Sequence, residues 1–166
     1  MSERTLVVGS LSKSHAMTGS RLGWLIGPKE IISKAIDLAT NMTYGVPGYI
    51  QHAGIFALRK GKEFEQKISK PFNRRQKLAV DILKDFPKLG HIPPQGAMYI
   101  MLDIRSTGMN GINFAHELLD TEKIAVMPGE SFGESASGHV RISLTLDDEK
   151  FKKTFRTVCN FANDLS

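Results

Sequence analysis

Cysteine and long apolar runs are scarce in this chain of 166 residues. The single cysteine, Cys159, excludes an internal disulfide framework and any metal site built from clustered cysteines. No apolar run approaches the roughly 20 residues that a membrane-spanning helix requires. The opening residues Met1 to Arg4 also lack the apolar segment of a secretory signal peptide. We therefore expect no metal, no membrane partner and, by default, a cytoplasmic location, with Cys159 as a small buried residue on a helix.

Internal repeats and low-complexity tracts are absent as well. With 41% hydrophobic and 23% charged residues, the chain can form one compact domain or two small ones. The net charge of +5 could indicate an acidic partner, but much of it lies between residues 59 and 77, interleaved with acidic side chains. That arrangement is typical of the wet face of a helix, whereas nucleic-acid-binding proteins usually gather basic and aromatic residues on one surface. We expect no nucleic-acid partner.

Two short apolar runs, residues 5–9 and 23–27, flank a polar loop near the start of the chain. Large apolar side chains occupy consecutive positions in both runs, which predicts strands that are buried on both faces. Residues 28–39 begin with proline and then place apolar side chains on one stripe, which predicts a helix that covers these strands. A turn-rich loop over residues 41–48 and a second helix over residues 50–61 follow.

The pattern from Lys62 to Asp85 predicts one long helix, which Pro71 should bend or briefly break. Beyond it, strands alternate with helices, as is typical of a small α/β unit. The expected elements are an extended entry over 91–96, strands over 97–104, 124–127 and 138–146, a helix over 112–121, and a final helix that Asp147 or Asp148 caps.

The polar loop between the first two strands combines one lysine, one arginine and several hydroxyl groups. A lysine amine forms a Schiff base with an aldehyde when it is neutral part of the time, which burial and a neighbouring cation such as Arg21 favour. The guanidinium of Arg21 and the hydroxyl groups of Ser10 and Ser12 suit a phosphate dianion. The loop therefore predicts a site at Lys13 for an aldehyde that carries a phosphate, as pyridoxal 5′-phosphate does.

The residues of this loop follow one another as Ser10-x-Ser12-Lys13-x-x-Ala16-Met17-Thr18-Gly19-x-Arg21-Leu22-Gly23. This run closely resembles the cofactor-lysine signature of the class I and II aminotransferases, which belong to fold type I of the pyridoxal-phosphate enzymes. The resemblance implies that Lys13 holds the cofactor and acts as the catalytic base. It also implies that Ser10 and Arg21 hold the cofactor phosphate, with Ser12 as a further hydroxyl donor.

Three later blocks occur in the order expected for the same family: Pro94-x-Gly96-Ala97-Met98-Tyr99, Val126-Met127-Pro128-Gly129-x-x-Phe132-Gly133 and Gly138-x-Val140-Arg141-Ile142-Ser143. The resemblance implies that Arg141 binds the substrate carboxylate, although an arginine in such a strand is more often a surface charge. The loop at Tyr44 resembles the family's loop at the dimer interface. Tyr44 is thus a candidate substrate contact from the second subunit, and packing within its own loop is the alternative.

The resemblance implies an α/β fold that corresponds to the C-terminal part of a fold type I pyridoxal-phosphate-dependent transferase. We expect residues 1–62 to be a fragment of the large-domain sheet with the cofactor lysine, and residues 63–166 to be the small C-terminal α/β domain, joined by the long helix. The family's enzymes are more than twice this length. We therefore expect a truncated chain that is inactive alone, in which residues 1–62 are poorly anchored or pair with another chain.

The implied activity is pyridoxal-phosphate-dependent transfer of an amino group from an amino acid to a 2-oxo acid, in a full-length protein that is a homodimer. One alternative is another fold type I reaction, such as that of a C–S lyase or of an enzyme like aminocyclopropane carboxylate synthase. Another is a non-catalytic aminotransferase-like interaction module. We expect His15, two residues from Lys13, either to pack or to support the site without touching the cofactor. Asp103 and Glu130 are single carboxylates for which the sequence shows no partner, so we assign them no catalytic role.

Overall fold

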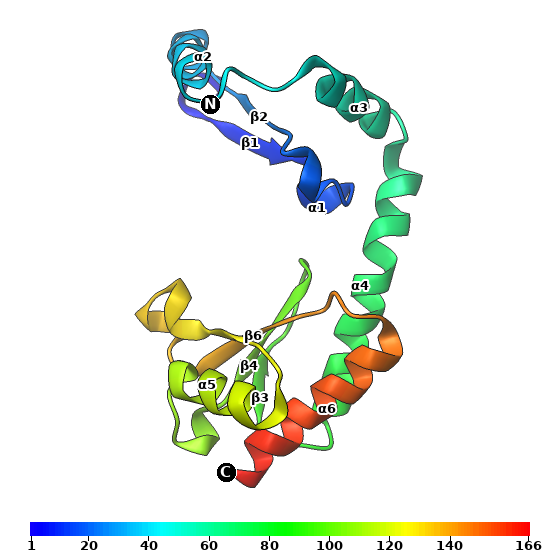
Figure 1. The fold of residues 1–166 in the computed structure, drawn as a ribbon, viewed down its shortest axis with the longest axis vertical. Coiled ribbons are helices and arrows are strands. Elements are labelled where there is room, and N and C mark those ends of the chain that lie inside the picture. Colours follow the sequence, from blue (N-terminus) through cyan, green and yellow to red (C-terminus); the bar gives the residue numbers. More distant parts are fainter. The chain divides into compact units, whose positions relative to one another are not determined.

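The computed structural model describes all 166 residues and divides into two compact units, Met1–Lys70 and Pro71–Ser166 (Figure 1). The division falls inside one helix, α4 (Gly61–Leu83), which continues through Pro71 without a break. Proline lacks the N–H of a helical hydrogen bond, so a division at this position is physically reasonable. The domain boundary that the sequence suggests, between residues 62 and 63, lies nearer the start of the same helix and stays a prediction.

The first unit combines a two-stranded antiparallel sheet with helices. In the sheet, Val7 lies opposite Ile26 and Ser10 lies opposite Gly23. These elements lie close to the predicted positions. Besides the start of α4 they are η1 (Ser2–Arg4), β1 (Val7–Ser10), α1 (Leu11–Ser14), η2 (Thr18–Ser20), β2 (Gly23–Ile26), α2 (Lys29–Thr43) and α3 (Gly48–Leu58).

The strands β1 and β2 are exposed, so the prediction of burial on both faces was wrong. All four residues of β2 and three of the four residues of β1 are exposed. Helix α2 contains no buried residue. The physical reason is that a sheet of two strands and its neighbouring helices cannot supply a covering layer on each face, and an isolated hairpin is at best marginally stable.

The second unit contains an antiparallel sheet of four strands in the order β3-β4-β6-β5, together with two complete helices and the end of α4. This arrangement confirms the α/β class. The strand predicted over 124–127 is reduced to the short edge strand β5, where a proline is tolerated. The elements are β3 (Gly90–Ile92), β4 (Tyr99–Asp103), η3 (Arg105–Thr107), α5 (Gly111–Glu122), β5 (Met127–Pro128), η4 (Gly129–Phe132), η5 (Glu134–Ala136), β6 (His139–Ser143) and α6 (Asp148–Asp164).

Alternation along β4 and β6 gives the sheet two different faces. Ile100, Leu102 and Val140 are at most 1% exposed and join the core with α5, α6 and the end of α4. The residues between them point to the opposite face, because successive side chains of a strand alternate. Tyr99 and Arg141 are half-buried residues of that second face.

Helix α6 closes the core of the second unit. Asp147 is its N-cap, because the Asp147 carboxylate accepts a hydrogen bond from the backbone N–H of Lys150 at 3.0 Å. Cys159 is fully buried in this helix, as predicted. Arg75 of α4 donates to the Asp148 carboxylate at 2.8 Å and thereby ties α4 to the start of α6. No helix of the chain is both long enough and apolar enough to cross a membrane.

Candidate functional site

The predicted cofactor lysine lies on the short helix α1, directly after β1. Ser10 is the N-cap of this helix: its Oγ accepts a hydrogen bond from the backbone N–H of Ser12 at 3.1 Å. The same hydroxyl donates to the carbonyl oxygen of Leu22 at 3.5 Å. The Lys13 side chain is exposed and takes part in no ion pair of the structure. Ser10 thus fixes the first turn of the helix that presents the amine.

Arg21 lies on the same connection between β1 and β2, after η2. Its backbone is left-handed, with φ of +50°, a conformation that non-glycine residues rarely adopt. One Nη of its guanidinium donates to the carbonyl oxygen of Thr18 at 2.8 Å. The side chain is otherwise exposed, so the other N–H groups of the guanidinium remain free for an anion.

The few buried residues of the first unit gather around α1. Leu11 is fully buried and His15 is 4% exposed, with its ring centroid 5.7 Å from that of Phe64. Gly54 of α3 also packs here, because a Cβ at this position would lie 2.2 Å from Leu22 and 3.3 Å from Leu11. His15 therefore packs as predicted. The lysine-bearing helix is anchored on both sides, although the neighbouring strands are exposed.

Arg141 lies in the second unit, in the middle of β6, opposite Met101 of β4 and Met127 of β5. Its guanidinium carbon is 4.1 Å from the ring centroid of Tyr99 and 4.6 Å from that of Phe132. Cation–π attraction operates at these distances. We call Tyr99, Phe132 and Arg141 the arginine cage. The rings cover the guanidinium, and no carboxylate of the chain pairs with it, so its N–H groups can bind an external carboxylate.

The two aromatic members of the cage are residues that sequence reasoning did not connect with Arg141. Tyr99 pairs with Ser143, and it is therefore the diagonal neighbour of Arg141 on the same face of the sheet. Phe132 comes from the loop after β5. Both residues stand in the quoted sequence blocks, but only the strand register brings them to the arginine.

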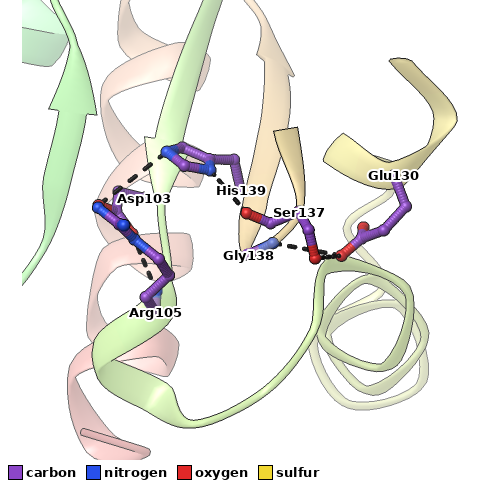
Figure 2. A network of polar contacts seen from close by, with 6 residues as sticks. All are labelled: Asp103, Arg105, Glu130, Ser137, Gly138 and His139. Carbon is purple, nitrogen blue, oxygen red and sulfur yellow. Dashed lines mark hydrogen bonds and ion pairs between the residues drawn. The ribbon is translucent and has the colours of Figure 1, made fainter. Parts of the chain in front are cut away.

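The expectation that Asp103 has no partner was wrong. Arg105 donates through Nε to Asp103 at 2.9 Å, and His139 lies 4.0 Å from the same carboxylate (Figure 2). The hydrogen bond from Arg105 lowers the pKa of the Asp103 carboxyl, against the opposing effect of burial. The turn at η3 folds the arginine back onto a residue two positions away. Because the charge of the Asp103 carboxylate is paired with Arg105 within the protein, we regard this contact as structural.

Glu130 also has partners, which corrects the second expectation. Its Oε1 accepts hydrogen bonds from the hydroxyl of Ser137 at 3.0 Å and from the backbone N–H of Gly138 at 3.2 Å (Figure 2). The same oxygen also accepts a hydrogen bond from the backbone N–H of Gly111 at 3.0 Å. The pKa of Glu130 is lowered, because its own backbone N–H and then those of Gly111 and Gly138 favour the charged carboxylate. No local sequence pattern signals these contacts, which join three separate segments.

The structure thus places the predicted residues in three places. Ser10 ends β1, whereas Ser12, Lys13 and Arg21 lie on the connection between β1 and β2. Arg141 lies in the arginine cage. Tyr44 follows α2, where its side chain is 94% exposed and its backbone is left-handed. The functional roles of these six residues stay predictions.

Comparison with known proteins identifies the relatives of this chain. Residues 1–158 match the family described as aminotransferase class I and II. The chain is 40% identical to the arginine–pyruvate transaminase of Pseudomonas aeruginosa over 165 residues, which is 99% of this chain and 42% of that protein. It is 36% identical to the aspartate aminotransferase of Pyrococcus horikoshii, over 89% of this chain and 38% of that protein. The chain therefore spans about two fifths of the length of these curated relatives.

Solved structures give the same result. The aromatic aminotransferase of Pyrococcus horikoshii OT3 superposes with a TM-score of 0.93 at 32% identity, covering 100% of this chain and 45% of that one. An aspartate aminotransferase of Thermus thermophilus gives a TM-score of 0.85 at 28% identity, over 99% of this chain and 42% of that one. Members of the matched family depend on pyridoxal phosphate. The expected resemblance is confirmed: this chain belongs to the class I and II aminotransferase family.

Proposed function

We propose that this chain carries the cofactor lysine and the substrate-carboxylate arginine of a pyridoxal-phosphate-dependent aminotransferase. The enzyme would move an amino group from an amino acid to a 2-oxo acid. The observation that supports this most strongly is the arginine cage: the guanidinium of Arg141 contacts two aromatic rings and has no carboxylate of its own. A buried or shielded cation without a partner is costly, so a site built this way suits an anionic ligand.

The donors on the connection between β1 and β2 fit the cofactor. Lys13 offers a primary amine for an aldehyde, and the free N–H groups of Arg21 offer a fork of donors for a phosphate. Ser10 and Ser12 add hydroxyl groups, with Ser10 also capping the helix of Lys13. When bound, the cofactor supplies an electron sink that weakens the bonds at the substrate α-carbon.

The chain's own residues would then orient the substrate and move its proton. Arg141 would bind the α-carboxylate through two parallel hydrogen bonds, which fixes the direction of the bond between the α-carbon and its hydrogen. The Nζ of Lys13, once free, would accept the proton from the α-carbon and return it as a general acid. Both tasks require exposed polar groups on anchored elements, which the lysine helix and the cage provide.

The whole protein is proposed to be a homodimer, with Tyr44 as a contact to the substrate bound by the other subunit. The full exposure of Tyr44 supports this assignment. We also propose that residues 1–62 belong to a large cofactor-binding domain, that residues 63–166 form the small domain, and that the enzyme is cytoplasmic. Because the chain spans 42% of the arginine–pyruvate transaminase, we expect no turnover from these 166 residues alone.

The first testable prediction concerns Lys13 in the full-length enzyme loaded with the cofactor. Lys13→Ala should abolish the absorbance of the lysine-linked cofactor and reduce turnover at least about a hundredfold, because the catalytic base is lost. Absorbance spectra and single-turnover kinetics with arginine or aspartate plus pyruvate measure both effects. The matched control is Lys29→Ala, an exposed lysine at the start of α2.

Retention of the lysine-linked absorbance in Lys13→Ala would contradict the assignment. Product analysis on the same samples tests the reaction type. Equal amounts of a new 2-oxo acid and a new amino acid are expected from amino-group transfer. Release of ammonia or of a thiol would instead indicate a lyase, and failure of the unmodified protein to bind the cofactor would indicate a non-catalytic module.

A further inference from the structure

Glu130 connects three segments of the second unit through one oxygen atom. It lies in η4, directly after β5, and its carboxylate turns back toward the start of β6 (Figure 2). The three donors to Oε1 are the first residue of α5, the end of the loop after η5, and the residue before β6. A carboxylate that accepts from two backbone N–H groups and a hydroxyl has little freedom to rotate.

The surroundings of Glu130 are packed so closely that only glycine fits at two neighbouring positions. A Cβ on Gly111 would lie 2.3 Å from Oε2 of Glu130 and 2.7 Å from the carbonyl oxygen of His139. A Cβ on Gly129 would lie 1.9 Å from the carbonyl oxygen of Ala136. The Glu130 carboxylate therefore packs directly against the start of α5, and Gly129 packs against the backbone at Ala136.

The second carboxylate oxygen of Glu130 is buried and has no hydrogen-bond partner. Burying an acceptor without a partner destabilises the fold. An apolar side chain at this position would avoid that cost but would leave the three donors without an acceptor. The cost therefore points to a role for Glu130 that goes beyond the stability of the core.

The loop that Glu130 closes carries Phe132, one of the two rings of the arginine cage. Phe132 is 50% exposed, so packing against the core does not fix its position. The backbone N–H of Gly133 donates to the carbonyl oxygen of Glu130 at 3.2 Å, which keeps Phe132 in the turn next to Glu130. Tyr99 needs no such support, because the strand register of β4 and β6 places it beside Arg141.

We propose that Glu130 is a positioning residue for the substrate-carboxylate site: by closing the loop from Gly129 to Ser137, it holds Phe132 over the guanidinium of Arg141. The inference rests on the proposed role of Arg141 and deepens it. Without the Glu130 carboxylate, the loop opens and Phe132 leaves the cage. Water then reaches one face of the guanidinium and weakens its hydrogen bonds to a bound carboxylate.

The second testable prediction measures this directly by nuclear magnetic resonance of the 166-residue chain. The δ protons of Arg141 feel the ring currents of Tyr99 and Phe132, and Arg141→Lys assigns their signals. In Glu130→Ala and in Phe132→Leu, about half of the ring-current shift should disappear, because one of two rings is lost. Glu130→Gln keeps the acceptor oxygen and should retain most of the shift.

The matched control is Glu134→Ala, which removes an exposed carboxylate from the same loop that accepts no side-chain hydrogen bond. It should leave the Arg141 signals unchanged. Amide signals of β4 and β6 report in every variant whether the sheet is intact. If Glu130→Ala unfolds the second unit, Ser137→Ala replaces it. This variant removes one of the three donors and should cause a smaller loss of the Arg141 ring-current shift than Phe132→Leu does.

Titration with sodium acetate, followed at the Arg141 Nε–H signal, tests the link to carboxylate binding. Glu130→Ala and Phe132→Leu should each weaken acetate binding about fivefold, and Glu134→Ala should change it less than about twofold. An unchanged Arg141 ring-current shift in Glu130→Ala, with the sheet intact, would overturn the inference. No acetate response at Arg141 in the unmodified chain would overturn the proposed role of Arg141 instead, while the ring-current result would still decide the role of Glu130.

Discussion

The thiol of Cys159 is enclosed in the core between α6 and the sheet. Burial raises its pKa to about 12, with the positive charge of Arg156 acting in the opposite direction. A thiol that stays protonated at neutral pH is a poor nucleophile. Cys159 is therefore a structural residue, and the ionisation of its thiol depends on whether the chain is folded.

The third testable prediction follows from this pKa. The folded state holds the Cys159 proton to higher pH than the unfolded chain, whose thiol has the ordinary value of 9.0. The stability that this proton contributes is complete below about pH 9 and is lost as the pH rises toward 12. The free energy of unfolding from urea titrations should therefore fall across this window, and less so in Cys159→Ala. Equal pH slopes in both proteins would contradict the prediction.

Residue chemistry could be predicted from the sequence only where neighbours in the chain are neighbours in space. A cap at Asp147 or Asp148 and the burial of Cys159 needed only the helical pattern, and the structure selects Asp147 as the cap. The partners of Glu130 come from Gly111 and from Gly138, so they could not be predicted without the fold. The Asp103–Arg105 pair is local, but Gly108 at the end of η3 signals only a turn and does not show which side chains pair across it.

At the scale of elements, the turn that leads into β4 is held by helix α4. Gln76 is 8% exposed, and its side-chain amide donates to the carbonyl oxygens of Gly96 at 2.8 Å and Ala97 at 3.0 Å. Ala97 has φ of +60°, a left-handed conformation that costs free energy for any residue with a Cβ. Gln76 therefore stabilises a strained turn that determines where β4 begins, at Tyr99.

The fourth testable prediction concerns this contact. Gln76→Ala leaves two carbonyl groups without their donor and should reduce the free energy of unfolding by about 1 to 3 kcal/mol. Asn73→Ala, an exposed neighbour on the same helix, should change it by less than about 0.5 kcal/mol. Urea titrations followed by circular dichroism measure both. Stability equal to that of the unmodified chain in Gln76→Ala would show that water replaces the amide.

The order of helices and strands was largely predictable, because hydrophobic periodicity and caps are local signals. The strand register was not, since pairing depends on contacts between distant segments. That register makes Tyr99 the diagonal neighbour of Arg141. The arginine cage could therefore not be predicted from the sequence. The exposure of β1 and β2 could not be predicted for a related reason. Consecutive apolar residues show that a strand can be buried on both faces, but other segments must supply the layers that cover it.

At the scale of the whole molecule, the two units differ sharply in their cores. The first unit buries only Leu11, His15 and Gly54, whereas the second contains the entire main hydrophobic cluster. Apolar side chains such as Val8, 79% exposed, and Ile26, 59% exposed, lie on the strands of the first unit. Strand edges of this kind promote pairing with other chains.

The fifth testable prediction separates the units by hydrogen exchange. Amides of β4, β6 and α6 should be protected at least about a hundredfold more than those of β1 and β2, because local opening is easiest where few apolar contacts are buried. Light scattering should show association that grows with concentration. Val8→Lys, which places a charge on an exposed strand, should reduce association and leave protection in the second unit unchanged. Equal protection in both units would contradict this assignment.

The placement of the chromophores makes the two units optically distinguishable. The only tryptophan, Trp24, lies in β2, and Tyr99 is the only tyrosine between residues 71 and 166. Tyr99 touches the guanidinium that is proposed to bind carboxylates, so an arriving anion changes the electric field at its phenol ring. Fluorescence excited at the indole follows the first unit. Because Tyr44 and Tyr49 also lie in that unit, the phenol signal of Tyr99 is the difference in near-ultraviolet circular dichroism between the unmodified chain and Tyr99→Phe, and ligand titrations need no added label.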